Sequence, residues 1–452
     1  MSPRLDRLDR AIAEAILGVD TLFGGDVTNP SGTGRFIADA WFSDEPLPAA
    51  FAHPTAARIR ASGGVSVPAP DRAAIAGYLA AVDIPAAIAT IDAEARSLGG
   101  PRGRYLEGLA LSCGVMWELA QELLGQGEPV PYARAVEASC GVAPSPSDPR
   151  AKLDRVAALL EATGYSGDLQ GAVASWRRDR LVPRKAIPAL GRAFIAEIDA
   201  ATAVHLLPHL PPALRAVPRA NVAFLPIENA WFSGSMNYLG RARRSDGSPE
   251  YEATYELNAS LEISVPEFVQ LVAHEVVPGH VTTFAYLQYL YWTGAVGFEA
   301  SVPTMNTRAA TLSEGIANNA ILIARGVTEI SDLHDPDLEL GLLLALLQDD
   351  AKNHASWLTW QEGWPQADVA ALLPRDFLVS AERADKLSGA WGRHPLLGRM
   401  YLPCYRAGTE KIAELRRHHP PGKFLPAVYS VHGLVDIVTI DEVLGAGSRL
   451  TG

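Results

Sequence analysis

The sequence is poor in cysteine, with only Cys113, Cys140 and Cys404 among 452 residues. An odd number of widely spaced cysteines argues against a disulfide framework and is typical of a protein in the reducing cytoplasm. Positive charge is also scarce, because 39 basic side chains face 51 acidic ones and leave a net charge of −12. Nucleic acids and anionic membranes attract basic surfaces, so we expect neither as a partner.

Long hydrophobic runs are absent as well. The most apolar run, residues 340–347, has eight residues, whereas a membrane span needs about 20. The opening residues Met-Ser-Pro-Arg-Leu-Asp-Arg are not followed by the apolar stretch of a secretory signal. These features favour a cytoplasmic protein.

Amphipathic helices are the dominant pattern in what is present. Apolar residues recur every three to four positions, as in Leu5, Leu8 and Ile12, and 48% of the residues are hydrophobic, enough to bury a large core. The sequence therefore predicts a mainly α fold. The predicted helices after the first segment cover about residues 71–98, 103–126, 148–163, 168–181, 184–206, 266–292, 308–326, 335–359, 374–391, 396–417 and 434–444.

One region, residues 219–262, has the composition of strands and a turn signal at Asp246-Gly247-Ser248-Pro249. It predicts a small antiparallel β insertion before the helix that begins at Pro266. If its last strand were an exposed edge, an extended peptide would pair with it through main-chain hydrogen bonds, and Tyr255 and Asn258 would bind substrate. The alternative is a purely structural hairpin.

The most informative helix contains His274-Glu275 and, after Pro278-Gly279, a second histidine, His280. Two histidines and an intervening glutamate are typical of zinc hydrolases, in which the histidines usually lie four residues apart on one helix face. Here the spacing is six residues, which a regular helix would rotate by about 240°. We expect proline to break the helix and glycine to adopt the left-handed conformation that returns His280 to the face of His274. The alternative is an ordinary His-Glu pair at a kink, with His280 capping a helix.

A catalytic zinc ion usually has three protein ligands. Glu314, 34 residues after His280, lies in a stretch of small and apolar residues where a helical hairpin would bring it beside the first helix. A glutamate buried there would be costly without a metal ion or another cation. The alternative is an exposed glutamate or one near a helix N-terminus.

Four segments together resemble a known family, the bacterial domain of unknown function 885, whose fold is similar to that of the thermostable carboxypeptidases of the gluzincin class. The matching segments are His274 to His280, Glu314-Gly315-Ile316-Ala317, Asp350 to His354, and Tyr405-Arg406-Ala407-Gly408. They keep the family's order between about residues 250 and 417. Four residues depart from the family pattern, namely Val281, Ile316 and the pair Pro403-Cys404.

The resemblance implies a single large helical zinc-metallopeptidase-like fold with a deep cleft. The length of 452 residues would suit about three average domains, but one large enzyme fold suits it equally. We expect residues 1–210 to form a helical wall or lid and residues 211–452 to form the metal-site region. The relatives also suggest a homodimer.

The predicted centre holds one zinc ion through His274, His280 and Glu314, and Glu275 accepts a proton from the attacking water. Tyr405 and His354 are the two candidates for donating a hydrogen bond to the oxyanion.

Each of these two candidates has an alternative role. His354 would simply pair with Asp350 one helical turn away, and Tyr405 would be a core aromatic. Arg406, in the last matching segment, is expected to contact substrate.

The predicted function is hydrolysis of peptide or amide bonds in short substrates by a zinc enzyme. A second possibility is a metallohydrolase for a specialised small-molecule amide or ester. The third, from another class, is a catalytically silent helical protein that binds a peptide or a partner.

Overall fold

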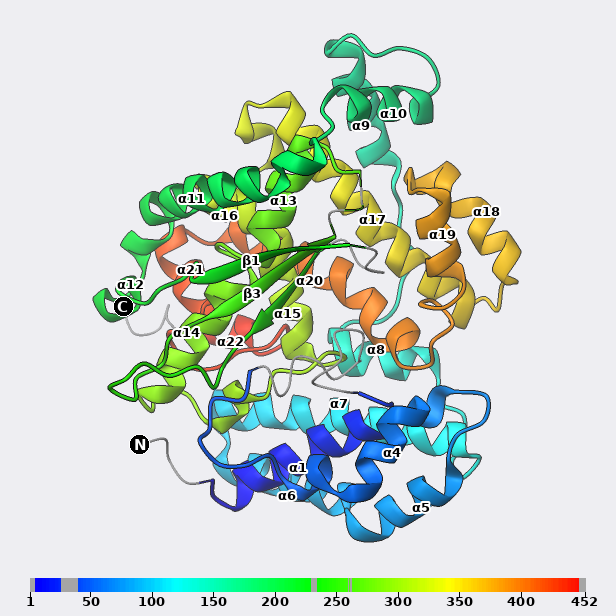
Figure 1. Ribbon diagram of the computed structural model, residues 1–452, viewed down its shortest axis with the longest axis vertical. Helices are drawn as coiled ribbons and strands as arrows, with labels where there is room; N and C mark the ends of the chain where they lie inside the picture. Colours follow the sequence, from blue (N-terminus) through cyan, green and yellow to red (C-terminus); the bar gives the residue numbers. More distant parts are fainter. Residues whose placement is uncertain (1–4, 26–39, 229–233, 259, 261, 447–452) are drawn as a thin grey trace.

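The computed structural model describes residues 5–25, 40–228, 234–258, 260 and 262–446, and it shows a mainly α-helical protein with one small sheet (Figure 1). This confirms the predicted fold class. The helices before the sheet are α1 (Arg7–Leu22), α3 (Ala49–Ala52), α4 (Pro54–Ser62), α5 (Arg72–Ala81), α6 (Ile84–Leu98), α7 (Gly100–Leu124), α8 (Tyr132–Cys140), α9 (Arg150–Ala162), α10 (Leu169–Asp179), α11 (Ile187–His205) and α12 (Pro212–Arg215).

The sheet consists of β1 (Val222–Ile227), β2 (Gly234–Tyr238) and β3 (Ala253–Asn258), with β3 in the middle. The predicted antiparallel pairing holds for β2 and β3, whose connection turns near Gly247 at φ 81°. β1, by contrast, runs parallel to β3. The chain leaves β1, forms β2 on the far side of the sheet and then returns between them, so β1 and β3 point the same way. Residues 229–233, 259 and 261 of the predicted strand region lie outside the described residues.

The central position of β3 corrects the prediction that an extended peptide pairs with it. Residues 253–258 pair with β1 on one side and, from Ala253 to Leu257, with β2 on the other. Both main-chain edges of the strand are therefore occupied over nearly its whole length. This arrangement favours the structural alternative.

Helices resume after the sheet and surround it (Figure 1). They are α13 (Val265–Glu275), α14 (His280–Trp292), α15 (Arg308–Asn318), α16 (Ala320–Arg325), α17 (Pro336–Trp360), α18 (Gln366–Phe377), α19 (Ala381–Ser388), a π-helical turn η6 (Leu397–Tyr401), α20 (Leu402–His418), α21 (Pro421–Val428) and α22 (Ile440–Ala446). The prediction of one helix over residues 374–391 is wrong, because the region contains the end of α18 (366–377) and the separate helix α19 (381–388). Pro374 lies inside the first of them, and Leu378 ends it with a left-handed backbone at φ 56°.

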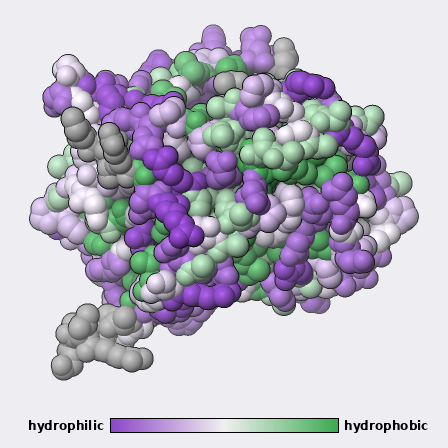
Figure 2. All heavy atoms as spheres, turned by 90° about the horizontal axis from the view of Figure 1, so that it is seen from below, coloured by the Kyte–Doolittle hydropathy of each residue, from purple (hydrophilic) through white to green (hydrophobic). Residues whose placement is uncertain are grey.

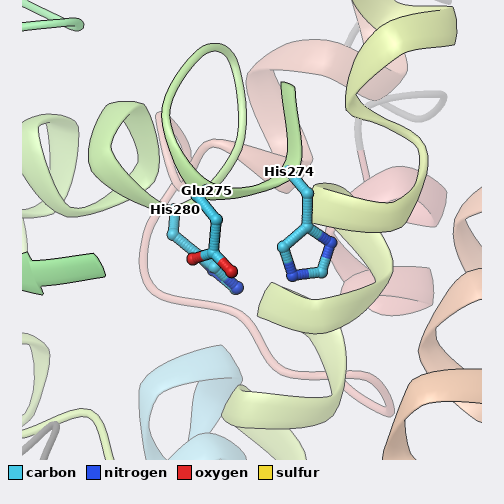
Figure 3. A group of neighbouring side chains, drawn as sticks. All are labelled: His274, Glu275 and His280. Atoms are coloured by element: carbon cyan, nitrogen blue, oxygen red, sulfur yellow. The ribbon is translucent and has the colours of Figure 1, made fainter. Parts of the chain in front are cut away.

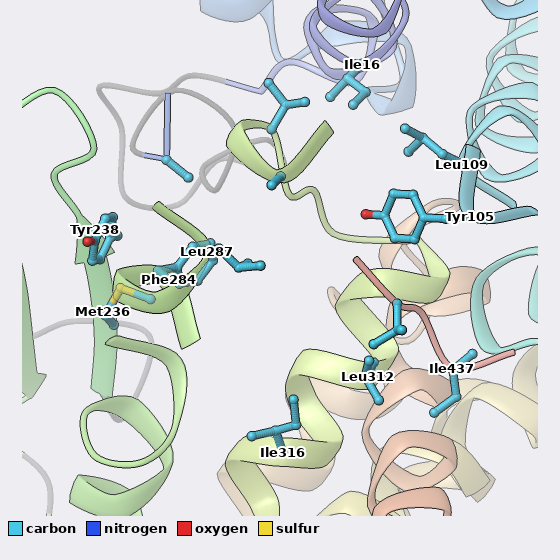
Figure 4. Close-up of a cluster of buried hydrophobic side chains, with 14 of the residues drawn as sticks. Ile16, Tyr105, Leu109, Met236, Tyr238, Phe284, Leu287, Leu312, Ile316 and Ile437 are labelled. Carbon is cyan, nitrogen blue, oxygen red and sulfur yellow. The ribbon is translucent and has the colours of Figure 1, made fainter. Parts of the chain in front are cut away.

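Helices from both halves of the chain share one hydrophobic core. Figure 4 shows members of this core from different parts of the chain, including Ile16 of α1, Tyr105 of α7, and Phe284 and Leu287 of α14. This core includes residues from both sides of position 210. The predicted roles of residues 1–210 as a wall or lid and of residues 211–452 as the metal-site region stay predictions.

Within the described residues, no single helix combines the length and the apolar composition of a membrane span, and only α5 and α6, bent by 42° relative to each other, do so as a pair. On the face seen from below, hydrophobic and hydrophilic side chains are interspersed (Figure 2).

Candidate metal centre

The predicted helix break lies between the two histidines. α13 ends at Glu275 and α14 begins at His280, with residues 276–279 between them. Figure 3 shows His274, Glu275 and His280 projecting to the same side from these two helix ends. Their ligand atoms all lie within 4.8 Å of one another, so this group is able to hold a metal ion.

The role of Gly279 differs from the prediction. Its φ is −74°, which is not left-handed. Glycine is needed here for space, because a Cβ would lie 2.5 Å from the carbonyl oxygen of Ala273 and nearer still to that of His274. The Gly279 amide donates to the same Ala273 oxygen at 3.1 Å, which holds the two helix ends together.

Glu314 on α15 also lies close to both imidazoles. Its Oε2 is 3.5 Å from His274 Nε2, and its Oε1 is 3.7 Å from His280 Nε2. Ligands bound at about 2.1 Å to a tetrahedral ion lie about 3.4 Å apart. The distances make Glu314 a candidate ligand in addition to the group of His274, Glu275 and His280.

The two imidazoles have the charge state that a metal ion requires. Burial lowers the pKa of His280 to about 4 and that of His274 well below its usual value, so both rings are neutral at pH 7. Burial raises the pKa of Glu314 to about 7. Glu314 Oε2 is buried without a hydrogen-bond partner among the described residues, and a cation between it and the two imidazoles would satisfy it.

Hydrogen bonds fix the orientation of both imidazoles. Nδ1 of His274 donates to Asn318 Oδ1 at 2.9 Å, and Nδ1 of His280 lies 3.2 Å from Ser313 Oγ. Asn318 in turn donates to Asp349 Oδ2 at 2.8 Å. A protonated Nδ1 leaves the Nε2 lone pair free for a metal ion, as in the outer shells of known metal sites.

The sequence reasoning missed Asn318 and Asp349. Asn318 lies four residues after Glu314 on the same helix. This spacing places both side chains on one helix face, so the sequence alone could have indicated Asn318 as a neighbour of Glu314. Asp349 is the residue before Asp350, which the resemblance singled out. Asp350 instead accepts a hydrogen bond from Lys152 at 2.7 Å.

Tyr401 was also missed, and it is the residue that contacts Glu314. Its hydroxyl donates to Glu314 Oε1 at 2.5 Å. Its ring packs edge-on against Tyr405, with centroids 5.2 Å apart. Tyr401 is the last of the five residues of the π-helical turn η6, directly before α20 begins at Leu402.

Tyr405 lies near the predicted centre. Burial and the carboxylates of Glu314 and Glu275 raise its pKa, so it remains a neutral donor. Lys352 Nζ lies over its ring, 3.2 Å from the centroid, and also donates to Asp349 at 2.8 Å. The predicted role of Tyr405 as a donor to the oxyanion stays a prediction.

The structure does not bring His354 to this group. Its Nδ1 accepts from the Ser147 amide at 3.2 Å, and its ring packs against Phe377 at 5.1 Å. Its predicted role as an oxyanion donor therefore lacks the required position. The reason is helical phase, since Asp349 rather than His354 is the residue of α17 that faces Asn318.

Arg406 is engaged with protein groups. It donates to Glu410 at 2.8 Å and to the carbonyl oxygen of Pro146 at 3.1 Å. It also lines a cavity of about 240 Å³ that has Asn318 in its wall. Substrate contact by Arg406 stays a prediction.

The two strand residues have different surroundings. Tyr255 is fully buried, and its hydroxyl has no hydrogen-bond partner among the described residues. Burial, with a smaller contribution from the carboxylate of Glu275, raises the pKa of Tyr255 well above its usual value. Asn258 is buried and accepts from the Ser260 amide at 3.0 Å. Substrate contact by either side chain stays a prediction.

Comparison with known proteins gives a fold but no family. No family model matches the sequence, and no curated protein matches it. The chain is similar to the solved structure of a candidate lipoprotein from Colwellia psychrerythraea, with a TM-score of 0.52, 16% identity, and coverage of 80% of this chain and 66% of that one. The solved structure of a candidate lipoprotein of unknown function from Shewanella oneidensis is also similar, with a TM-score of 0.48 and 13% identity. The match covers 76% of this chain and 65% of that one.

The chain thus spans slightly less than two thirds of the length of each of these proteins. At such low identity, the first likeness shows a shared fold alone.

Proposed function

We propose that the protein is a zinc-dependent hydrolase of peptide or amide bonds. One observation carries the proposal: the buried carboxylate of Glu314 lies 3.5 and 3.7 Å from the Nε2 atoms of His274 and His280. Two neutral imidazoles and a carboxylate form the donor set of many catalytic zinc sites. Zinc bound there would act as a Lewis acid toward water and toward a substrate carbonyl.

Glu275 is the proposed general base. Its carboxylate lies beside the imidazole of His280, and one of its oxygens is within 4.8 Å of a ring nitrogen of each histidine. From this position it would take a proton from the attacking water and deliver it to the leaving nitrogen. Tyr405, which burial keeps protonated, would donate a hydrogen bond to the oxygen that becomes negative.

The proposed substrates are short peptides or small-molecule amides, and the proposed location is the cytoplasm. Burial of His280 and Glu314, at 5% and 4% exposure, supports small substrates, since a folded protein segment would not reach them. The homodimer implied by the family resemblance remains part of this proposal, and sedimentation of the purified chain tests it.

The decisive experiment is elemental analysis followed by hydrolysis of a panel of di- and tripeptides and small amides and esters, with and without a chelator. We expect one zinc ion per chain and chelator-sensitive cleavage. A chain that binds no zinc and gains no thermal stability on its addition would reject the proposal in favour of a silent binding protein. Cleavage confined to small amides or esters would point to the specialised hydrolase.

The role of Glu275 as general base is tested with the variant Glu275→Gln, and Glu267→Gln is the matched control. Both glutamates lie on α13, but Glu267 pairs with Arg177 at 2.7 Å instead of facing the histidines. We expect Glu275→Gln to keep zinc and lose hydrolysis, and Glu267→Gln to keep both. Full activity of Glu275→Gln would show that the base is misassigned.

A further inference from the structure

A cavity of about 60 Å³ adjoins the metal centre. Its wall includes His280, Glu314 and Tyr401, so it begins at the same side chains that would hold and orient the ion. The remaining wall is largely apolar, with Phe284 and Leu287 from α14. It is separate from the larger cavity behind Asn318, which shares none of these residues.

Tyr105 on α7 supplies a polar group in this apolar wall. Figure 4 shows its hydroxyl directed into the space between α7 and α14, toward Leu287. The residue is 4% exposed, and none of the hydrogen bonds among the described residues involves its hydroxyl. Burial and the nearby carboxylates of Asp436 and Glu299 raise its pKa, so the phenol keeps its proton.

Several buried tyrosines here donate to the main chain, whereas the buried hydroxyls of Tyr255 and Tyr286 have no partner among the described residues. Tyr78 donates to the carbonyl oxygen of Ala50 at 2.5 Å, and Tyr429 donates to that of Pro278 at 2.8 Å. Tyr105 instead presents its donor to the cavity. An occupant with a hydrogen-bond acceptor at this point would bind the Tyr105 hydroxyl.

We infer that this cavity binds the acyl side of the substrate: a short, mainly apolar chain attached to the carbonyl group at the metal centre, with an oxygen acceptor near its far end for Tyr105. This inference rests on the proposed function and names the substrate class for that site. Phe284 and Leu287 contact the apolar part, and the Tyr105 hydroxyl donates to the distal oxygen.

The cavity volume limits the length of that chain. One water-sized group needs about 10–15 Å³ of such volume, so 60 Å³ holds roughly four to six non-hydrogen atoms. A side chain of the size of leucine or methionine fits this limit, whereas a tryptophan side chain exceeds it.

The test uses the zinc-loaded full chain and straight-chain acyl hydroxamates, whose head group binds zinc, together with analogues that replace one distal methylene by an ether oxygen. Calorimetry gives each Kd. We expect Kd to fall about fourfold per methylene until four to six tail atoms are reached, and then to stop falling. We expect the best-placed ether oxygen to improve Kd about fivefold.

Three variants assign this behaviour to the cavity. Leu287→Phe should shorten the optimal tail by one or two atoms, and Leu287→Ala should lengthen it. Tyr105→Phe, which removes a single oxygen atom and preserves packing, should abolish the preference for the ether oxygen without changing the alkyl series. Leu290→Phe is the control, since Leu290 is a buried residue of the same helix outside the cavity wall.

An affinity that is independent of tail length, or an optimum that none of the variants moves, would overturn the inference. A second arm measures the thermal stabilisation of the metal-free chain by alkan-1-ols of one to eight carbons. A chain-length optimum that Leu287→Phe shortens supports the cavity assignment even if the chain cleaves no peptide. Failure of the proposed hydrolysis is thus distinguishable from failure of this inference.

Discussion

The backbones of Gly315 and Gly408 touch where α15 and α20 cross. A Cβ on Gly315 would lie 2.5 Å from the carbonyl carbon of Gly408, and one on Gly408 would lie 2.8 Å from the Gly315 amide nitrogen. Glu314 precedes the first glycine, and Tyr405 lies three residues before the second. The close crossing therefore brings the tyrosines of the α20 segment to the carboxylate of Glu314.

The first prediction concerns this crossing. Gly408→Ala should push the helices apart, lower the free energy of unfolding by roughly 1–3 kcal/mol and weaken zinc binding. The control is Gly114→Ala on α7, where a Cβ meets nothing within 4 Å and where alanine should be neutral or stabilise by up to about 1 kcal/mol. Urea denaturation and zinc titration of both variants provide the measurements. Equal behaviour of the two variants would contradict the packing argument.

The second prediction concerns the hydrogen bond from Tyr401 to Glu314. Tyr401→Phe should weaken zinc binding by about tenfold to a hundredfold, because partners of metal ligands contribute on this scale. Tyr132→Phe is the matched control, since it removes a buried hydrogen bond of 2.7 Å to Ser356 and leaves Glu314 untouched. Competition with a chromogenic chelator measures both affinities. Similar losses in the two variants would assign Tyr401 to stability alone.

The sequence predicted the residues of the candidate metal centre better than the residues that contact them. His274, His280 and Glu314 were recognisable because ligand chemistry restricts residue type and because a broken helix leaves Pro278-Gly279 as a local signal. Tyr401 has no such local signal, since it lies 87 residues after Glu314 in the sequence and contacts it only through the tertiary packing of α15 and α20.

The wrong predictions for His354 and for the direction of β1 have the same cause, which is that tertiary packing decides them. His354 was chosen by sequence order, whereas the rotation of α17 that points Asp349 toward Asn318 is set by tertiary packing. The parallel placement of β1 likewise depends on which side of β3 it joins. Local patterns thus predicted element type and ligand chemistry, but not helix phase or strand order.

The third prediction tests the amide that orients His274. Asn318→Ala should raise the zinc Kd about tenfold to a hundredfold, because the His274 ring loses the acceptor that fixes its Nδ1 proton. Asn353→Ala is the control: Asn353 is a buried amide on α17 that donates to the carbonyl oxygen of Ser145 at 2.9 Å. A larger loss of zinc affinity in the control would exclude the proposed role of Asn318.

The fourth prediction concerns pH. Zinc binds the ionised carboxylate, and the pKa of Glu314 in the metal-free chain is about 7, so zinc must displace a proton below that pH. The zinc Kd should rise about tenfold per pH unit as the pH falls from 7 to 5, since the pKa of His280 is about 4 and that of His274 is also low. Glu314→Gln should bind zinc more weakly, with a flat profile over this range. An equally steep profile in that variant would assign the proton to another group.

The last prediction separates the two neighbouring tyrosines by function. Tyr401 contacts the proposed ligand Glu314, whereas Tyr405 is the proposed donor to substrate, and Lys352 lies 3.2 Å from the centroid of its ring. Tyr405→Phe should keep zinc affinity and lower kcat about a hundredfold to a thousandfold, the usual cost of losing an oxyanion donor. Lys352→Met should keep zinc and lower kcat less, because it releases the ring but leaves the hydroxyl. Stopped assays for kcat and KM, with zinc content measured on the same samples, distinguish these effects. A Tyr405→Phe variant that loses zinc in parallel with activity would show that Tyr405 supports the ligands instead of the reaction.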